Sequence, residues 1–250
     1  MKKILTILFL NCATMPLAEA MQGQDELIVA FEKQGITVDV ANSRIQIQTK
    51  ICQLREPLEY LLVMQPQGKD HESLLYSENL NAESLNAAML LVGAEKGENG
   101  KMLPIEPAPS EDEIMQGAPT HYYQPPTGSG FLLWAEWEIT NENGDIEHYK
   151  FRVEDLVLNV QEERTYQRGE WIYLGSRFIR PHKDAEEFFA AQGQGNLISL
   201  VHFSPANHLL GGVDPRGSNQ SIWYPNIFLM PPLDYPVTLT FELVKRPQPQ

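Results

Sequence analysis

The sequence has few cysteines, few basic residues and no long apolar run. Among 250 residues there are 2 cysteines, and 19 lysines and arginines stand against 33 aspartates and glutamates, for a formal charge of −14. Two cysteines are too few for an iron–sulfur cluster or a cysteine-rich zinc site. The acidic balance repels phosphate groups and disfavours non-specific binding to nucleic acid. No stretch reaches 18 uninterrupted apolar residues, so no transmembrane span is predicted.

The motifs of several enzyme classes are also missing. There is no G-x-S-x-G sequence of a serine hydrolase and no glycine-rich loop that joins a strand to a helix in a nucleotide-binding fold. None of the 6 histidines belongs to an H-E-x-x-H pair. The sequence therefore predicts no metal site and no cofactor-binding site, and the identity of any cofactor stays open.

Residues 1–20 have the pattern of a signal peptide. The basic pair Lys2-Lys3, an apolar run over residues 4–10 and the small residues of Ala18-Glu19-Ala20 occur in the required order. We expect cleavage after Ala20 and a periplasmic or secreted protein. The mature chain would then keep one cysteine, Cys52, and would have no internal disulfide.

Residues 21–250 are predicted to form one β-rich domain. Apolar residues at every second position predict a hairpin over 35–51, and similar runs predict strands over 58–63, 71–76, 131–139, 146–153, 156–160, 171–179, 196–203 and 237–244. These runs neighbour one another along the chain instead of alternating with helices. The predicted class is α+β and β-rich, with a mainly antiparallel sheet or sandwich and two short helices.

Two segments have helix signals, and two long segments read as loops. Residues 82–92 follow Asn81, a capping residue, and precede Gly93, which favours a helix end. Residues 184–191 form the second expected helix, with Asp184 as its cap. Residues 94–128 and 204–236 are rich in proline and glycine and are expected to be irregular.

The most unusual local composition is Gly68-Lys69-Asp70-His71-Glu72-Ser73. We expect this hexapeptide at the bend of a hairpin between residues 58–63 and 71–76. In that hairpin His71 and Ser73 share one face, and Val63 pairs with Glu72. This register would bring Glu59 and Glu72 to a common face, and a slip of one residue would cancel it.

The hexapeptide permits two interpretations. His71 can carry a proton near neutral pH, with Glu72, Asp70 or Glu59 to orient it, which would suit a hydrolase or a metal-assisted enzyme. The structural interpretation is a polar turn in which Lys69, Asp70 and their neighbours form local hydrogen bonds.

Three other features have a functional and a structural interpretation. Cys52 suits either a thiol nucleophile with Arg55 nearby or a small buried side chain. Ser176 suits either a reactive serine or a structural position, since it follows Gly175 inside an expected strand, where glycine often marks a bulge. The aromatic residues Tyr122, Tyr123, Trp134, Trp137, Trp171 and Trp223 would suit a sugar-binding face, or in part a core.

Several segments together resemble the YdjY-domain family of exported bacterial proteins. They are Ile51-Cys52, residues 58–63, residues 68–75, residues 85–93, residues 152–155, residues 171–176, Trp223-Tyr224-Pro225-Asn226 and Pro231-Pro232. The family is largely uncharacterised, so the resemblance implies little about activity. It favours Cys52, Glu59, His71, Glu72 and Ser73 as a group to test together, with Ser176 as a lesser candidate. Some relatives are linked to electron transport, but this chain lacks the cysteines for a cluster.

These observations favour an exported accessory or ligand-binding module of unknown specificity. Its partner would be a small molecule or a protein, and not nucleic acid. The alternative is a small extracytoplasmic hydrolase or metal-assisted enzyme that uses His71 with Glu72 or Glu59. The two differ in one spatial requirement, since an enzyme needs His71 near a carboxylate in a concave pocket.

Overall fold

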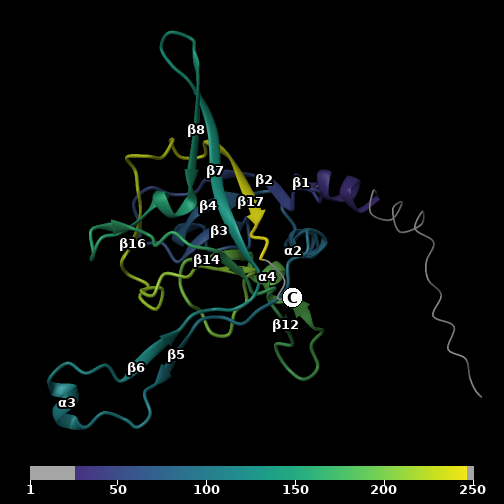
Figure 1. Cartoon of the computed structure of the whole chain (residues 1–250). Coiled ribbons are helices and arrows are strands. Elements are labelled where there is room, and N and C mark those ends of the chain that lie inside the picture. The colour runs from purple at the N-terminus through teal and green to yellow at the C-terminus, as the bar shows by residue number, and fades with distance from the viewer. Residues whose placement is uncertain (1–25, 247–250) are drawn as a thin grey trace, which may run out of the picture.

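A closed ring of eight strands forms the centre of the protein, seen in a computed structural model that describes residues 26–246 (Figure 1). The expected signal peptide, residues 1–20, lies outside the described residues. In spatial order the strands are β2 (Arg44–Ile51), β17 (Pro236–Leu243), β7 (Gly130–Thr140), β11 (Trp171–Tyr173), β15 (Leu210–Gly211), β14 (Asn196–Ser199), β3 (Tyr60–Met64) and β4 (Ser73–Ser77). The ring closes because β2 pairs with β17 on one side and with β4 on the other.

The predicted β-rich class and the mainly antiparallel sheet are confirmed. Within the ring only two contacts are parallel, β14 with β15 and β3 with β4. The strands form a closed barrel and not the two facing sheets of a sandwich. Closure leaves no strand edge in the ring and lets side chains from all eight strands fill one interior.

The interior is filled by the apolar residues that alternate along the strands. In β2, Ile45, Ile47, Thr49 and Ile51 are buried, while Gln46, Gln48 and Lys50 between them are more exposed. Phe241 of β17 and Phe131 of β7 meet edge to face with ring centroids 6.3 Å apart. The barrel therefore has a packed core, as expected for eight strands.

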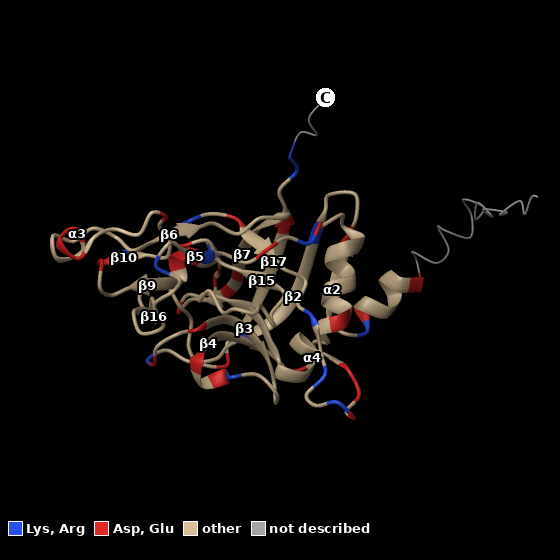
Figure 2. Ribbon diagram, turned by 90° about the horizontal axis from the view of Figure 1, so that it is seen from below, with Lys and Arg blue, Asp and Glu red and all other residues tan. Residues whose placement is uncertain are grey.

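Helix α2 (Ala82–Leu91) confirms the first predicted helix. The Asn81 side chain accepts a hydrogen bond from the Ser84 N–H at 2.9 Å, and the helix lies beside the barrel (Figure 2). The second predicted helix is wrong, because α4 spans Ala190–Gln194 and ends at Gly195, whose φ is +71°. Residues 182–185 form a turn instead, closed by a hydrogen bond from the Ala185 N–H to the His182 carbonyl at 3.0 Å, and Phe188–Phe189 form a short strand. A further helix covers residues 26–32.

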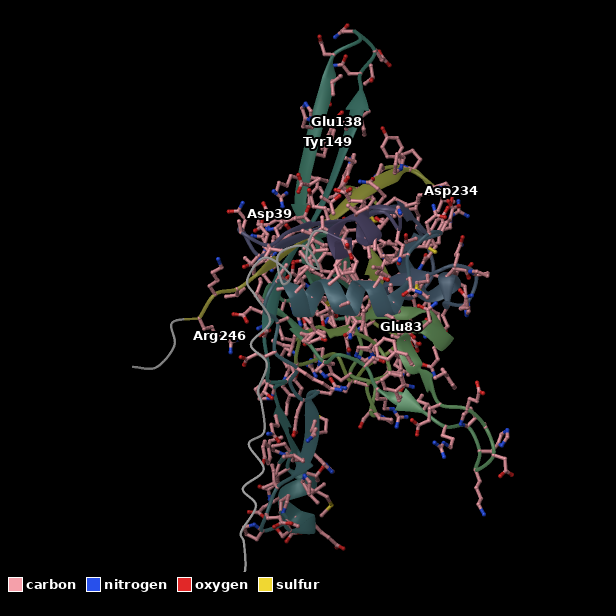
Figure 3. All side chains as sticks on the ribbon, turned by 90° about the vertical axis from the view of Figure 1, so that its right-hand side faces the viewer. Asp39, Glu83, Glu138, Tyr149, Asp234 and Arg246 are labelled. Atoms are coloured by element: carbon pink, nitrogen blue, oxygen red, sulfur yellow. The ribbon has the colours of Figure 1, made fainter. Side chains whose placement is uncertain are left out.

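Two hairpins join strands that are close in sequence. The hairpin predicted over 35–51 is confirmed, as β1 (Ile36–Asp39) pairs antiparallel with β2. Strand β8 (Ile146–Arg152) pairs with β7 in a ribbon that projects from the barrel and carries Glu138 and Tyr149 (Figure 3).

Residues 94–128 form an arm and not the irregular loop that the sequence predicts. Strands β5 (Lys101–Pro104) and β6 (His121–Gln124) pair, and the acidic helix α3 (Glu111–Met115) lies at the tip (Figure 2). Tyr123 of the arm stacks on His202 of the body, with centroids 5.0 Å apart and planes 6° apart.

The strand predicted over residues 171–179 is interrupted. Gly175 and Ser176 have φ of +62° and +52°, and this left-handed pair ends β11 before the short strand β12 (Phe178–Ile179). The remaining elements are the pair of β12 with β13 (Phe188–Phe189), the three-stranded sheet of β10 (Arg164–Thr165), β9 (Val157–Asn159) and β16 (Trp223–Pro225), and the 3₁₀ helices η1 (Asp70–Glu72) and η2 (Val153–Leu156).

The hairpin predicted around the hexapeptide is wrong, because β3 and β4 run parallel. Tyr60 pairs with Ser73 and Leu62 with Leu75, so residues 65–72 return along the length of β3. The return is tight at Gly68, where a Cβ atom would lie 2.5 Å from Val63 Cβ and 2.8 Å from the Gly195 carbonyl oxygen. Glycine permits this close approach, and η1 then aligns the chain for β4.

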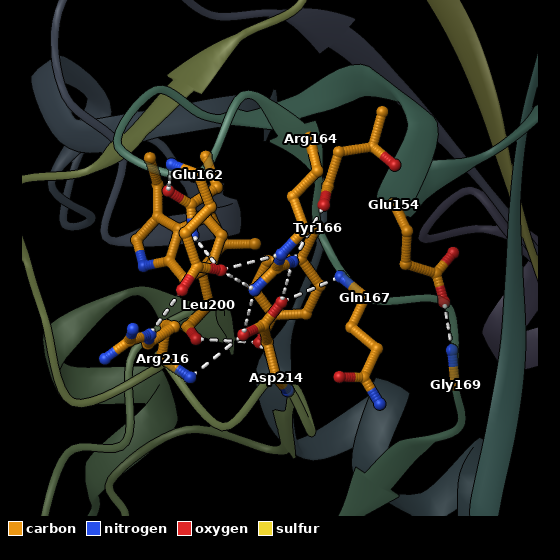
Figure 4. Close-up of polar contacts among 12 residues, drawn as sticks. Glu154, Glu162, Arg164, Tyr166, Gln167, Gly169, Leu200, Asp214 and Arg216 are labelled. Carbon is orange, nitrogen blue, oxygen red and sulfur yellow. Dashed lines mark hydrogen bonds and ion pairs between the residues drawn. The ribbon is translucent and has the colours of Figure 1, made fainter.

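A buried polar network lies under the three-stranded sheet. The carboxylate of Asp214 is fully buried and accepts hydrogen bonds from Arg164 at 2.6 and 3.1 Å (Figure 4). The backbone N–H groups of Gln167 and Arg216 donate to the same carboxylate at 2.8 and 2.9 Å. Because each carboxylate oxygen is satisfied, the network is structural.

Over residues 26–246, no helix is both long and apolar enough to cross a bilayer.

Candidate functional site

Lys69, Glu59 and Glu72 form an ion cluster, which we call the Lys69 cluster. Lys69 Nζ lies 3.1 Å from Glu59 and 2.8 Å from Glu72. The backbone supports this arrangement, since the Glu59 N–H donates to the Glu72 carbonyl at 2.9 Å. The predicted register, with Val63 opposite Glu72, is wrong, because Val63 pairs with Tyr76. Glu59 and Glu72 meet instead through the parallel strand pair and η1.

The two carboxyl groups of the Lys69 cluster have different electrostatic environments. Burial, together with the neighbouring Glu72, raises the pKa of Glu59 in spite of Lys69. Burial also opposes ionisation of Glu72, but hydrogen bonds from Lys69 and Glu59 outweigh it and lower the pKa of Glu72. One lysine therefore bridges two carboxyl groups, of which Glu72 ionises more readily.

We expect Lys69→Met to lower the free energy of unfolding at pH 7 by about 1 kcal/mol, because two part-buried carboxylates lose their shared cation. The pKa of both carboxyl groups in the folded protein would rise, so the loss should shrink as the pH falls and the groups become protonated. Urea unfolding at pH 7 and pH 4.5 measures both effects. Lys101→Met is the matched control, since Lys101 pairs with Glu98 on an exposed surface. A loss that is independent of pH would contradict this account.

His71 lies in an exposed turn. Its ring nitrogens are 3.6 Å from Asp70 and 3.8 Å from Glu72, both longer than a hydrogen bond, and its side chain is 70% exposed. Asp70 accepts a weak hydrogen bond from Gln65 at 3.3 Å. Among the described residues no three His, Cys, Asp or Glu side chains converge to hold a metal ion. This geometry does not give His71 the concave setting that an enzyme requires.

The serine candidates have structural hydrogen bonds. Ser73 is fully buried, and its hydroxyl donates to the Leu75 carbonyl at 2.8 Å. Ser176 donates to the Asn207 carbonyl at 2.7 Å and accepts from the Ala191 N–H at 3.1 Å. Both hydroxyls hold the backbone in place, and no described histidine accepts from either.

Cys52 is half-buried beside the hexapeptide. Its thiol donates to the Asp70 carbonyl at 3.0 Å. Burial, with a smaller effect of Asp70 and Asp234, raises the pKa of Cys52 to about 12. A raised pKa is the opposite of what a thiol nucleophile requires.

We expect alkylation of Cys52 by iodoacetamide at pH 8 to be tens of times slower in the folded protein than in urea. A pKa of about 12 makes the thiolate fraction roughly a thousandth of that of a free cysteine, and the higher intrinsic nucleophilicity of such a thiolate recovers part of the rate. Mass spectrometry of the peptide that contains Cys52 gives the rate. Equal rates in the folded and unfolded chain would refute the raised pKa.

A recess of about 220 Å³ opens beside the Lys69 cluster. Its lining residues come from β3, from the end of α4, from β14 and from the segment that precedes β15: Tyr60, Gln194, Asn196, Phe203, Ser204, Pro205, Asn207 and His208. Lys69 links the two sites, because its N–H donates to the Asn196 side chain at 3.1 Å and its Nζ lies 5.9 Å from the Tyr60 ring centroid.

His208 is the most unusual residue of the recess. It is 2% exposed, and its Nε2 atom is buried without a hydrogen-bond partner among the described residues. Burial, together with nearby His202, lowers the pKa of His208 to about 4, so the ring is neutral at pH 7. A buried polar atom without a partner costs about 1–3 kcal/mol, and in native proteins such an atom often marks a functional position.

Sequence reasoning missed this recess. Its residues lie in two predicted strands, 58–63 and 196–203, just after the helix predicted over 184–191, and in the loop predicted over 204–236, and no motif joins these segments. The only available signal was the concentration of asparagine, proline and histidine over residues 204–208. The four tryptophans do not form an exposed face, because Trp137, Trp171 and Trp223 are buried and Trp134 is covered by Lys150 and Arg152.

Comparison with family models, with curated proteins and with solved structures finds no match to this chain. The resemblance to the YdjY-domain family therefore stays a prediction that depends on the sequence segments alone.

Proposed function

We propose that this chain is an exported ligand-binding module and that the recess at His208 is its binding site. The observation that carries the proposal is a concave recess lined by uncharged side chains from β3, α4, β14 and the segment before β15. His208 is one of these residues, but its Nε2 atom is buried on the side of Gly211 and is not open to the recess. Export is supported by the signal-peptide pattern of residues 1–20, and membership of the YdjY-domain family by the segments quoted above.

The recess is suited to binding because its walls are fixed in advance. Arg177 Nε donates to the Asn207 side chain at 2.8 Å, and the Asn207 amide donates to Gln194 at 3.1 Å. Tyr60 and Phe203 stack with centroids 5.3 Å apart. Since these contacts already order the side chains, a ligand would lose little free energy in arranging them.

Binding is tested by calorimetric titration of the mature protein with single-ring compounds of three kinds: neutral sugars, cyclic carboxylates and cyclic amines. We expect at least one compound to bind with a Kd of millimolar or lower, and Gln194→Trp to weaken that binding at least tenfold. Gln194 is exposed at the rim, so tryptophan would fill the recess without entering the core. Gln161→Trp, at an exposed position that does not line the recess, is the matched control. No binding by any compound, or equal binding by Gln194→Trp, would refute the proposal.

The enzymatic alternative is supported by one observation, the raised pKa of Glu59 beside the lowered pKa of Glu72. Such a pair can supply an acid and a base. Both groups are held by Lys69, however, and His71 is exposed. Ester and glycoside hydrolysis that is lost in both His71→Ala and Glu72→Gln, while thermal stability is kept, would establish the alternative and displace the binding module.

A further inference from the structure

We propose that the recess recognises an uncharged, hydroxyl-bearing six-membered ring, that is, a single neutral pyranose unit. This inference rests on the proposed function, because it names the ligand class of the same site. It follows from the charge of the lining, from its hydrogen-bonding groups and from its size.

The lining is uncharged at neutral pH. None of the eight lining residues is acidic or cationic, and His208 is neutral. A charged ligand would lose hydration on entering and would find no opposite charge in the walls. The charged groups nearby lie behind the lining: Arg177 donates to Asn207 at 2.8 Å, and Lys69 is paired with Glu59 and Glu72 at 3.1 and 2.8 Å. Neutral ligands are therefore favoured over carboxylates and amines.

The polar groups of the lining suit hydroxyl groups. Asn196, Asn207 and Gln194 carry side-chain amides, which donate and accept hydrogen bonds. A sugar hydroxyl also does both, so neighbouring hydroxyls can pair with neighbouring amides. The amide oxygens already accept hydrogen bonds from Lys69, from Arg177 and from the Asn207 amide, so the remaining amide N–H groups are the ones that a ligand would meet. A hydrocarbon or a plain aromatic ring would offer these N–H groups no acceptor.

One wall of the recess is apolar. Phe203 stacks on Tyr60 and meets the His208 ring edge to face, at 5.3 and 6.5 Å between centroids. Pyranose rings have an apolar face of C–H groups that can pack against such side chains. The recess holds about 220 Å³, below the roughly 300 Å³ at which pockets for drug-sized ligands begin. It therefore suits one ring.

The test compares neutral pyranoses with charged analogues of the same ring. The mature protein is titrated with glucose, galactose and N-acetylglucosamine, and then with glucuronate and glucosamine. We expect at least one neutral sugar to bind with a Kd of millimolar or lower, and its charged analogue to bind at least tenfold more weakly. Phe203→Ala and Gln194→Trp should each raise the Kd for the neutral sugar at least tenfold, while Gln161→Trp leaves this Kd unchanged. Thermal melting of each variant checks that it is folded.

A non-saccharide ring separates failure of the sugar assignment from failure of the binding site. Nicotinamide is a neutral ring with an amide and without hydroxyls. If nicotinamide or a charged sugar binds, loses affinity in Gln194→Trp and exceeds every neutral sugar, the recess is a binding site and the pyranose assignment is wrong. If none of the compounds binds, both proposals are wrong.

Discussion

Phe241→Ala is expected to lower the free energy of unfolding by about 3–5 kcal/mol, the usual cost of removing a buried aromatic ring. Phe241 is fully buried in β17, between β2 and β7, and packs against Phe131. The substitution removes apolar contacts and leaves a cavity at the centre of the barrel. Because strands from the whole chain surround this position, the surroundings cannot collapse easily to fill the space.

Urea unfolding followed by intrinsic fluorescence measures the loss, and Phe228→Ala is the matched control. Phe228 is 87% exposed, so its substitution should change the stability by less than about 0.5 kcal/mol. Similar losses in the two variants would show that Phe241 does not lie in a packed barrel interior.

Arg164→Met is expected to cost about 3 kcal/mol at pH 7, in the range for breaking a buried ion pair by removing one partner. The substitution leaves the carboxylate of Asp214 fully buried without its counter-ion. Arg164 itself is about one third exposed, with 34% of its side chain accessible. Water can therefore replace part of the guanidinium, which places the loss at the lower end of the range.

The effect of Arg164→Met should depend on pH in a defined direction. Burial opposes ionisation of Asp214, but the hydrogen bonds from Arg164 and from the backbone outweigh it and hold the pKa of Asp214 below its usual value. In the native protein this group contributes stability at pH values above its unfolded pKa, and the contribution is lost as the pH falls through the lower folded pKa. In the variant the pKa of Asp214 rises. The loss in free energy of unfolding relative to the native protein should therefore be largest at neutral pH and shrink toward pH 4.

Arg180→Met is the control for this experiment. Arg180 pairs with Glu187, and both side chains are 53% exposed, so the loss should be below about 1 kcal/mol. If Arg164→Met also lowered the free energy of unfolding by less than about 1 kcal/mol, the Asp214 network would not stabilise the fold.

Local order was predictable where one segment contained all the necessary information. The hairpin over residues 35–51 has a two-residue period and a short turn, and α2 has its own capping residue in Asn81. The hexapeptide shows the opposite case. Its composition suited a hairpin bend, but the direction of β4 depends on Gly68 crossing close to Val63 and Gly195. The contact of Gly68 with Gly195 joins segments about 127 residues apart in the sequence, as does the hydrogen bond from Lys69 to Asn196.

The candidate residues divide in the same way. A common face for Glu59 and Glu72 was predicted only for a hairpin with Val63 opposite Glu72; that register is wrong, and the two groups meet through the parallel pair of β3 and β4. His71 is in a polar turn, and Ser73 and Ser176 bond to backbone carbonyls, as the structural interpretations expected. The recess was not predictable, because Tyr60, Asn196 and His208 meet only after β3 pairs with β14.

The sequence by itself determined the β-rich class, the acidic charge, the strands with clear alternation and the capped helix α2, because composition and short-range periodicity are local properties. The tertiary structure alone decided the closure of the barrel, the parallel pairing of β3 with β4 and the burial of His208, whose Nε2 atom has no partner within residues 26–246. These features depend on contacts between distant segments, and the free energy of such contacts is set by how all the strands pack around one core.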